Sequence, residues 1–290
     1  MKILFVSDLH LDHWLMAGRD PLAAVPQSVW DQVEALFIIG DLSNKPKVRW
    51  RPLLEHVGRY VPLDRVFITP GNHDYYDFQL DGDDRLAEIA TDAGASFAQK
   101  AEVMLGGCRI LCCTLWTDFT LAGHREATRA AMMAEAEAQM NDYRYIRIGG
   151  EGYRRARPAD TARRHADHRA WLEGKLAEPF DGDTIVATHH APHPDCLAPP
   201  VSRLDAAYAS DLTSLIGAHA PTAWVYGHTH MPRAFTAGAT ELRNVSLGYP
   251  HQVPETEIAA QLLQGLAKVE RGRVALKSSS DRRSDLDAEA

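Results

Sequence analysis

The sequence is poor in cysteine and contains no long hydrophobic run. Its 290 residues include four cysteines, none of which forms a C-x-x-C pair with another, so neither a disulfide framework nor a thiolate zinc site is expected. No apolar run approaches the ~20 residues that span a bilayer. The apolar residues 1–6 have no basic region and no small-residue cleavage site beside them, so they do not resemble a signal peptide. We expect a cytoplasmic protein with buried free thiols and no membrane contact.

Basic residues are fewer than acidic ones. There are 31 Lys and Arg against 39 Asp and Glu, which gives a formal net charge of −8. Because contacts to nucleic-acid phosphates need Lys and Arg, this balance makes nucleic acid an unfavourable partner. With 45% hydrophobic and 24% charged residues, the composition is that of a globular protein and excludes collagen, coiled coil and wholesale disorder. We expect residues 1–277 to form a single domain and the polar residues 278–290 to form a disordered tail.

Short β-branched, apolar runs alternate with helical stretches in the first part of the chain. Strands are predicted at 2–6, 36–39 and 65–69, with helices at 26–35 and 48–59 between them. This alternation is typical of a parallel sheet in an α/β fold. Further along we expect a helix, a hairpin around a Gly-Gly turn, two more strands and a helix between them: 83–93, 103–105 with 109–115, 184–187, 223–226 and 210–216.

Between residues 118 and 180 the strand pattern gives way to segments rich in Ala, Glu, Met and Arg. Two helices are predicted there, at about 125–140 and 160–176, and we interpret the segment as a helical insertion. Residues 144–169 contain eight Arg against three acidic residues, which is a local charge of +5. One interpretation is a solvated helix face. The other is a lid whose arginines bind the phosphate or a second anionic group of a substrate.

Polar residues, many of them histidines, collect directly after the predicted strands. In open α/β sheets this edge is where ligands bind. The motifs, in chain order, are Asp8-Leu9-His10, Gly40-Asp41, Gly71-Asn72-His73-Asp74, Thr188-His189-His190 and Gly227-His228-Thr229-His230. Each motif alone is also typical of a turn or a helix cap, but five of them in this order indicate one shared site.

The side chains of these motifs suit a transition-metal centre. Asp, Asn and His donors favour Mn, Fe or Zn over Ca. In an extended segment, residues two apart point to the same side, so D-x-H and H-x-H can each present two donors to one space. Seven donors are too many for one ion and suit two divalent ions that share a carboxylate: Asp8, His10, Asp41, Asn72, His189, His228 and His230.

The order D-x-H, GD, GNHD, H and GHxH resembles that of the calcineurin-like metallophosphoesterase superfamily, and the motifs cover residues 8–230. The resemblance implies a four-layer α/β/β/α sandwich of two mixed β-sheets flanked by helices. It also implies that Asp41 bridges two divalent ions, Mn²⁺, Fe²⁺/Fe³⁺ or Zn²⁺. One ion would be held by Asp8, His10 and His230, and the other by Asn72, His189 and His228. The family usually uses the first histidine after the strand, so His189 is preferred to His190.

The resemblance further implies catalytic roles. A metal-bridging hydroxide would attack the phosphorus atom in line. His73 is similar in position to the histidine near the leaving group, where it would act as general acid. Asp74 would orient His73 and favour its protonated form. No covalent intermediate is expected.

Family membership does not determine the substrate. The GDxxDRG-type extension of the protein Ser/Thr phosphatases is absent after Gly40-Asp41, which disfavours that activity. Much of the chain resembles bacterial metallophosphoesterases without an assigned substrate, with LWTDF at 115–119, NDYR at 141–144 and THHAPH at 188–193. We expect substrate contacts from Asn72, His190, Trp116, Arg144 and Arg147.

Three functions remain open from the sequence. The first is hydrolysis of a small anionic phosphodiester or phosphomonoester, such as a nucleotide-like molecule. The second is a nuclease acting on single strands or ends, which the net charge disfavours although the Arg-rich segment could form a local groove. The third is a non-catalytic scaffold, which would be expected to lose ligands, whereas none is missing here.

Overall fold

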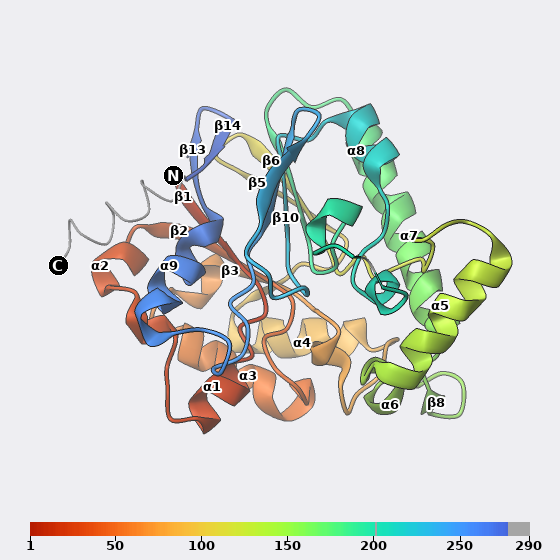
Figure 1. Ribbon diagram of the computed structural model, residues 1–290. Coiled ribbons are helices and arrows are strands. Elements are labelled where there is room, and N and C mark those ends of the chain that lie inside the picture. The colour runs from red at the N-terminus through yellow and green to blue at the C-terminus, as the bar shows by residue number, and fades with distance from the viewer. Residues whose placement is uncertain (201, 278–290) are drawn as a thin grey trace.

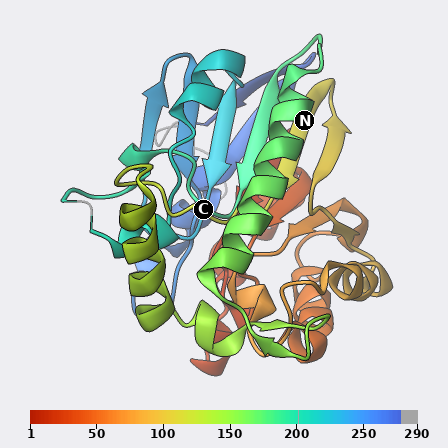
Figure 2. The ribbon, with the colours of Figure 1, turned by 90° about the vertical axis from the view of Figure 1, so that its right-hand side faces the viewer.

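Two mixed β-sheets, each with six strands, pack face to face at the centre of the molecule (Figures 1 and 2). The computed structural model describes residues 1–200 and 202–277, so the tail expected at 278–290 lies outside the described residues. Helices cover the outer face of both sheets. The architecture is therefore the four-layer α/β/β/α sandwich that the sequence predicted.

The first sheet contains the strands expected from the N-terminal apolar runs. In order across the sheet its strands are β14 (Arg273–Leu276), β13 (Leu266–Glu270), β1 (Lys2–Val6), β2 (Val33–Ile39), β3 (Val66–Thr69) and β4 (Ser96–Phe97). Strands β1 to β4 are parallel, and β13 pairs antiparallel with β1 and with β14. The carboxyl ends of β1, β2 and β3 consequently meet at one edge of the sheet.

The second sheet presents its parallel strands to the same edge. In order its strands are β11 (Ala234–Ala237), β12 (Thr240–Asn244), β10 (Ala223–Tyr226), β9 (Thr184–Thr188), β6 (Cys108–Cys113) and β5 (Ala101–Leu105). Strands β12, β10, β9 and β6 are parallel, while β11 and β5 are antiparallel strands at the two edges. An isolated bridge between Ser7 and Ser246 joins the ends of the two sheets.

Alternate residues of the central strands face different layers, as the twofold period of a strand requires. Phe5 of β1 packs between the sheets, in a cluster with Ile110 of β6 and Ile185 of β9. Leu4 and Val6 point the opposite way, toward the helices outside the first sheet. Both faces of these strands are therefore buried, which explains why they are continuous apolar runs.

The helices fall into two outer layers and one additional group. The first sheet is covered by α1 (Leu11–Met16), α2 (Gln27–Trp30), α3 (Pro46–Val57), α4 (Asp83–Ala93) and α9 (Ile258–Leu262). The second sheet is covered by α7 (Pro158–Ala177) and α8 (Thr213–His219), at the right of Figure 1. Helices α5 (Glu126–Gln139) and α6 (Asp142–Tyr145) share a separate apolar cluster around Phe119 and Met132.

The helix predicted at 26–35 is wrong in its second half. The helical turn α2 ends at Trp30, and Val33 and Ala35 belong to β2. These two residues pair with Lys2 and Ile3 of β1. The parallel pairing with β1 thus outweighs the local helical pattern, which is a tertiary effect that a short sequence window does not contain.

The two helices predicted between residues 118 and 180 are present as α5 and α7, but the segment also holds a strand pair that was not predicted. This ribbon consists of β7 (Arg147–Ile148) and β8 (Arg154–Arg155). Leu172 and Leu176 of α7 pack on the second sheet, so α7 is an outer-layer helix and not part of a lid. No helix in the described part of the chain is long and apolar enough to cross a membrane.

Candidate metal centre

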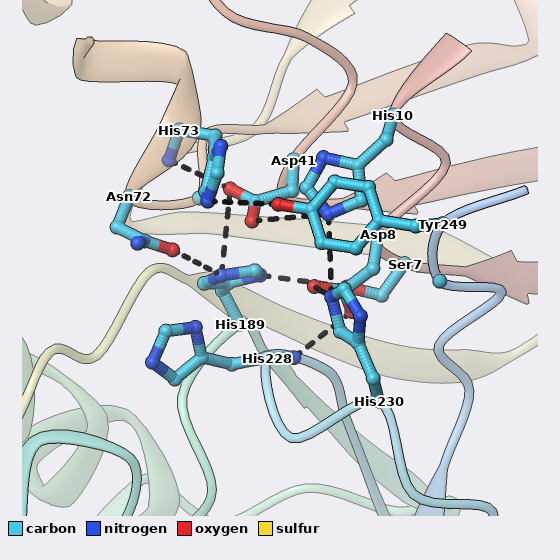
Figure 3. Close-up of polar contacts among 12 residues, drawn as sticks. Ser7, Asp8, His10, Asp41, Asn72, His73, His189, His228, His230 and Tyr249 are labelled. Carbon is cyan, nitrogen blue, oxygen red and sulfur yellow. Dashed lines mark hydrogen bonds and ion pairs between the residues drawn. The ribbon is translucent and has the colours of Figure 1, made fainter. Parts of the chain in front are cut away.

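The predicted donor residues converge in space at the shared edge of the two sheets (Figure 3). Asp8 and His10 follow β1, Asp41 follows β2, and Asn72 follows β3 just before the 3₁₀ turn His73–Tyr75. From the second sheet come the residues that follow β9 and β10, which are His189, His228 and His230. Residues from both sheets therefore line one site.

Several of these residues have a left-handed backbone conformation that is uncommon outside glycine. The φ angles are 53° at Asp8, 41° at His10, 59° at Asp41, 65° at His228 and 50° at His230. Such conformations cost of order 1–3 kcal/mol each and persist only where the surroundings hold them. Here the loops hold each other, because the Asp8 N–H donates to Gly40 O at 3.0 Å and the His10 N–H donates to Asp41 O at 2.9 Å.

Two motif glycines allow these loops to approach one another closely. A Cβ atom at Gly71 would lie 2.2 Å from Asp41 Oδ1, and one at Gly227 would lie 2.0 Å from Ser7 Oγ. Neither contact is sterically possible. The sequence needs glycine at these positions so that the backbone can pass directly beside the donor side chains.

The candidate metal-binding residues form two neighbouring groups, and Asp41 lies where the groups meet. Asp8, His10 and His230 form one group, and Asp41, His189 and His228 form the other, with the donor atoms of each group within 4.8 Å of one another. Asp41 faces both groups, because its Oδ2 lies 3.8 Å from His10 Nε2 and its Oδ1 lies 3.5 Å from His189 Nε2. A third overlapping group combines His10 and Asp41 with His73.

Short distances link the donors within each group. His230 Nε2 lies 3.1 Å from Asp8 Oδ1 and 3.2 Å from His10 Nε2. In the second group His189 Nε2 lies 3.0 Å from Asn72 Oδ1. In addition, His228 Nε2 is buried and has no hydrogen-bond partner among the described residues. Buried nitrogen and oxygen donors in this arrangement fit divalent metal ions.

The pKa values in the site follow from burial and from the mutual proximity of the charges. Burial lowers the pKa of His10 and of His228 well below the usual value, so both imidazoles are neutral and able to bind a metal. Burial also raises the pKa of Asp41, and the neighbouring Asp8 and Asp74 raise it further. Burial opposes ionisation of Asp8 as well, but the adjacent His230 brings its pKa below the usual value.

Of the two adjacent histidines, His189 is the one that reaches the donor cluster. Its Nε2 faces Asn72 and Asp41, as given above. His190 instead has its Nδ1 at 3.2 Å from Thr114 O, and its ring lies 5.0 Å from that of Trp116. The geometry thus supports the choice of His189 and places His190 behind the site.

The pairing of Asp74 with His73 is wrong. The Asp74 carboxylate accepts hydrogen bonds from the backbone N–H groups of Asp41 and Gly71, at 2.8 and 2.9 Å. It also accepts from the Ser43 N–H at 3.1 Å and from Trp50 Nε1 at 2.8 Å. Burial raises the pKa of Asp74 to about 6 despite these bonds. Asp74 therefore fixes the loops after β2 and β3 and does not contact the His73 side chain.

Asn44, not Asp74, is the hydrogen-bond partner of His73 Nδ1. His73 Nδ1 lies 2.8 Å from Asn44 Oδ1, which makes Nδ1 the protonated nitrogen of this pair. His73 Nε2 then faces the Tyr249 hydroxyl at 3.4 Å, as Figure 3 shows. Burial, together with nearby His189, lowers the pKa of His73 to about 3. The free protein therefore holds a neutral His73, contrary to the expectation that Asp74 favours the charged form.

Three of the expected substrate contacts are also corrected. Arg144 is exposed and donates to Ala138 O at 3.0 Å, and Arg147 belongs to β7. Trp116 is 2% exposed and packs in the core beside Tyr75. Like His190, these residues do not line the cavities at the site.

Three arginines of the Arg-rich segment pair with nearby acidic residues. Arg154 and Arg163 both form ion pairs with Asp160, and Arg164 lies 3.6 Å from Asp83. The alternative in which this segment is a solvated structural face is thus favoured over the arginine lid.

Two connected cavities open at the donor cluster. The smaller, about 340 Å³, is lined by the donors Asp41, Asn72, His228 and His230. The larger, about 650 Å³, extends away from them. Four residues line both cavities, namely His73, Tyr76, Asn141 and Tyr249. Tyr76, Asn141 and Tyr249 were not predicted, because they carry no metal-binding signature in the sequence.

Asp142 is a further residue of the site that the sequence did not identify. Its Oδ1 accepts a hydrogen bond from Asn72 Nδ2 at 2.8 Å and another from the Tyr76 hydroxyl at 2.6 Å. By holding the amide nitrogen of Asn72, Asp142 directs the amide oxygen toward His189. It belongs to the N-D-Y-R sequence noted above, which was the available signal.

Comparisons with known proteins agree with this geometry. The family model described as calcineurin-like phosphoesterase matches residues 1–232. An uncharacterized protein of Acanthamoeba polyphaga mimivirus is 24% identical in an alignment of 277 positions that covers 87% of this chain and 93% of that protein.

Solved structures show the same fold. A phosphopantetheinyl hydrolase from Mycobacterium tuberculosis has a TM-score of 0.65 at 22% identity, covering 87% of this chain and 90% of the other. A dimetal phosphatase from Danio rerio has a TM-score of 0.51 at 14% identity, covering 93% of both chains.

Proposed function

The chain belongs to the calcineurin-like phosphoesterase family and is a metal-dependent phosphoric ester hydrolase, and we propose that it uses two metal ions to hydrolyse a small phosphodiester or phosphomonoester. The observation that carries this proposal is the position of Asp41. Its two carboxylate oxygens face two separate donor groups, as a ligand shared by two ions must.

The proposed ligand set follows the two groups. Asp8, His10 and His230 hold the first ion, Asp41 is shared, and Asn72, His189 and His228 hold the second. Divalent ions at such a site supply Lewis-acid charge and an activated water for attack on phosphorus. The protein contributes fixed donor positions, buried surroundings and the hydrogen bonds that orient Asn72.

His73 is the proposed acid for the leaving group. It lines both cavities, with Nδ1 held by Asn44 and Nε2 near the Tyr249 hydroxyl, which a ligand would displace or share. An anionic phosphoester beside Nε2 would raise the low pKa of His73 and favour its protonation. The proton at Nε2 would then be donated to the departing oxygen.

The two alternatives are less well supported. A nuclease would need a basic groove, whereas the chain carries a net charge of −8 and three arginines of its Arg-rich segment are paired with acidic residues. A non-catalytic scaffold has no need of a complete ligand set in a preformed buried site.

The experiment that tests the proposal compares metal-free and Mn²⁺-loaded protein on a panel of phosphoesters. The panel contains p-nitrophenyl phosphate, bis-p-nitrophenyl phosphate, cyclic nucleotides and single-stranded DNA. Because the solved relative is named a phosphopantetheinyl hydrolase, a phosphopantetheinyl ester is included. We expect hydrolysis of at least one small ester that chelation abolishes and Mn²⁺ restores. Full activity after exhaustive chelation would contradict the proposal.

His73→Ala separates the role of the acid from metal binding. We expect turnover to fall by about 10²–10⁴-fold, the usual contribution of a positioned acid, while the bound Mn²⁺ per chain stays at the wild-type level. His124→Ala, at an exposed histidine of the loop before α5, is the matched control and should change neither quantity. Loss of Mn²⁺ from His73→Ala would instead make His73 a ligand.

A further inference from the structure

The larger cavity beside the metal centre has walls made of aromatic rings. Tyr76 and Tyr145 lie on one side, with ring centroids 5.6 Å apart. Tyr249 and His251 line it as well, with nearly parallel rings (9°) and centroids 5.7 Å apart. Tyr145 is 47% exposed although it is a large aromatic residue. Aromatic side chains that line a hollow of about 650 Å³ are suited to packing against a planar group.

The same cavity carries little charge. Among the described residues that line it there is no Lys or Arg. Its acidic residue, Asp77, lies 3.7 Å from Lys45. A second phosphate or another anionic group would find no cationic partner on these walls, so an uncharged group is favoured.

The position of the cavity relates it to the leaving group of the reaction. His73, the proposed acid, and Tyr249 line both this cavity and the one that contains the metal donors. A phosphoester with its phosphorus at the donors can therefore extend its organic group into the larger cavity, which these aromatic residues line. Tyr76 packs on the imidazole of His73 with centroids 4.2 Å apart, so the aromatic wall begins at the proposed acid itself.

We propose that this aromatic cleft, defined by Tyr76, Tyr145, Tyr249 and His251, binds a planar, uncharged leaving group of the nucleoside class. The inference rests on the proposed phosphoesterase function and specifies its substrate as a phosphoester of a nucleoside, without a second phosphate.

The test uses substrates that differ only in the presence of the base. Adenosine 5′-monophosphate is compared with ribose 5-phosphate, and the methyl diester of each is compared in the same way. We expect the Mn²⁺-loaded protein to have a kcat/KM about tenfold or more higher for the member that carries the base, as one stacked base would give. Equal values for both members of the hydrolysed pair would overturn the proposal.

Tyr145→Ala tests the cleft directly. Its ring is half exposed at the cavity wall, so its removal should leave the fold intact, and the ratio of the two kcat/KM values should fall by about tenfold. The matched control is Tyr153→Ala, at a tyrosine that is 54% exposed in the turn between β7 and β8 and outside the cavity. This control should keep the wild-type ratio. An unchanged ratio in Tyr145→Ala would contradict the cleft assignment.

A binding measurement without phosphate separates the two proposals. Calorimetry should show that adenosine binds, that ribose does not, and that Tyr145→Ala weakens adenosine binding about tenfold. If adenosine binds but no ester of the panel is hydrolysed, the proposed function fails and the cleft stands. If esters are hydrolysed but adenosine and ribose behave alike, the cleft fails and the phosphoesterase function stands.

Discussion

Asp142 is a residue outside the proposed ligand set that fixes the side chain of Asn72. Its carboxylate is buried, and burial raises its pKa, although the hydrogen bonds from Tyr76 and Asn72 act in the opposite direction. The energetic cost of burying this carboxylate is offset only while both donors remain in place. Asp142, Asn72 and Tyr76 therefore form one unit in which each side chain fixes the next.

We predict that Asp142→Ala weakens Mn²⁺ binding at the second ion site by about 10–100-fold, the usual effect of losing a partner of a metal ligand. Without its acceptor, the amide of Asn72 can rotate and turn its NH₂ group toward His189. Titration calorimetry with Mn²⁺ measures the effect.

Asp142→Asn provides the control for this prediction, because the asparagine keeps an Oδ1 acceptor for Asn72 and Tyr76. It should retain most of the wild-type affinity. If Asp142→Ala binds both ions as tightly as the wild type, Asp142 has no positioning role.

The site residues that could be predicted from the sequence lie in short local motifs, whereas those that were missed contact a partner far away in the sequence. Asp8, His10 and the other proposed ligands lie in short motifs after strands, so the spacing alone predicts that they share a site. Asn44, Asp142 and Tyr249 act through a partner that is distant in the sequence. The assignment of Asp74 failed for the same reason, since adjacency in sequence to His73 does not decide which backbone groups its carboxylate meets.

At the scale of the elements, helix α7 packs on the second sheet and is joined to the loop that follows β6. Its His168 is buried, and the Leu115 N–H donates to His168 Nδ1 at 3.1 Å. Burial, with a further contribution from Arg164, lowers the pKa of His168 to about 3. The packing of α7 against the loop after β6 therefore requires a neutral imidazole.

This requirement predicts a pH-dependent stability. The unfolded chain takes up a proton on His168 below its ordinary pKa of about 6.5, whereas the folded chain does so only near 3. The contribution is therefore complete above about pH 6.5 and is lost as the pH falls toward 3. Between pH 7 and pH 5 the free energy of unfolding should fall by about 2 kcal/mol through this residue.

His168→Asn isolates the effect, because the asparagine Oδ1 can accept the Leu115 N–H but does not titrate. In urea unfolding at pH 7 and pH 5 in the presence of a chelator, its loss of stability should be smaller than that of the wild type. His124→Asn, at an exposed histidine, should behave like the wild type. Parallel behaviour of all three proteins would refute the assignment.

Strands could be predicted where a short stretch of sequence carries the apolar pattern by itself. The central strands are buried on both faces, so their apolar runs identify β1, β2, β3, β9 and β10. The hairpin of β13 and β14 was missed although its turn at Arg271-Gly272 has positive φ at both residues, 49° and 77°. Its exposed outer positions interrupt the apolar pattern, and its pairing with β1 is a contact across nearly the whole chain.

At the scale of the whole molecule, the net charge of −8 hides an uneven distribution. Asp8, Asp41 and Asp74 lie together at the buried edge between the sheets. Burial makes the largest contribution to the raised pKa of Asp41, and the neighbouring Asp8 and Asp74 raise it further. Without bound cations, the repulsion between these carboxylates lowers the stability of the folded protein. Two divalent ions bound there would reverse the sign of the local field, so we expect the stability of the molecule to depend on metal binding at Asp41.

Asp41→Asn should therefore change stability in opposite directions with and without metal. In the presence of a chelator we expect a higher Tm than that of the wild type, because the variant keeps the Oδ1 acceptor for the His73 N–H and removes a buried charge next to two others.

In Mn²⁺ at about 100 times the wild-type Kd, the free energy of unfolding of the wild type should rise by about 2.7 kcal/mol per site. That of Asp41→Asn should rise little. Differential scanning calorimetry of both proteins in both buffers measures these opposite changes in Tm. The control is Asp31→Asn, at an exposed acidic residue, whose Tm should match that of the wild type in both buffers.

A lower Tm of metal-free Asp41→Asn would show that the Asp41 carboxylate stabilises the protein without metal. A Mn²⁺ shift as large as that of the wild type would exclude Asp41 as the shared ligand. Because the first result concerns folding and the second concerns metal binding, either expected effect can be absent without the other.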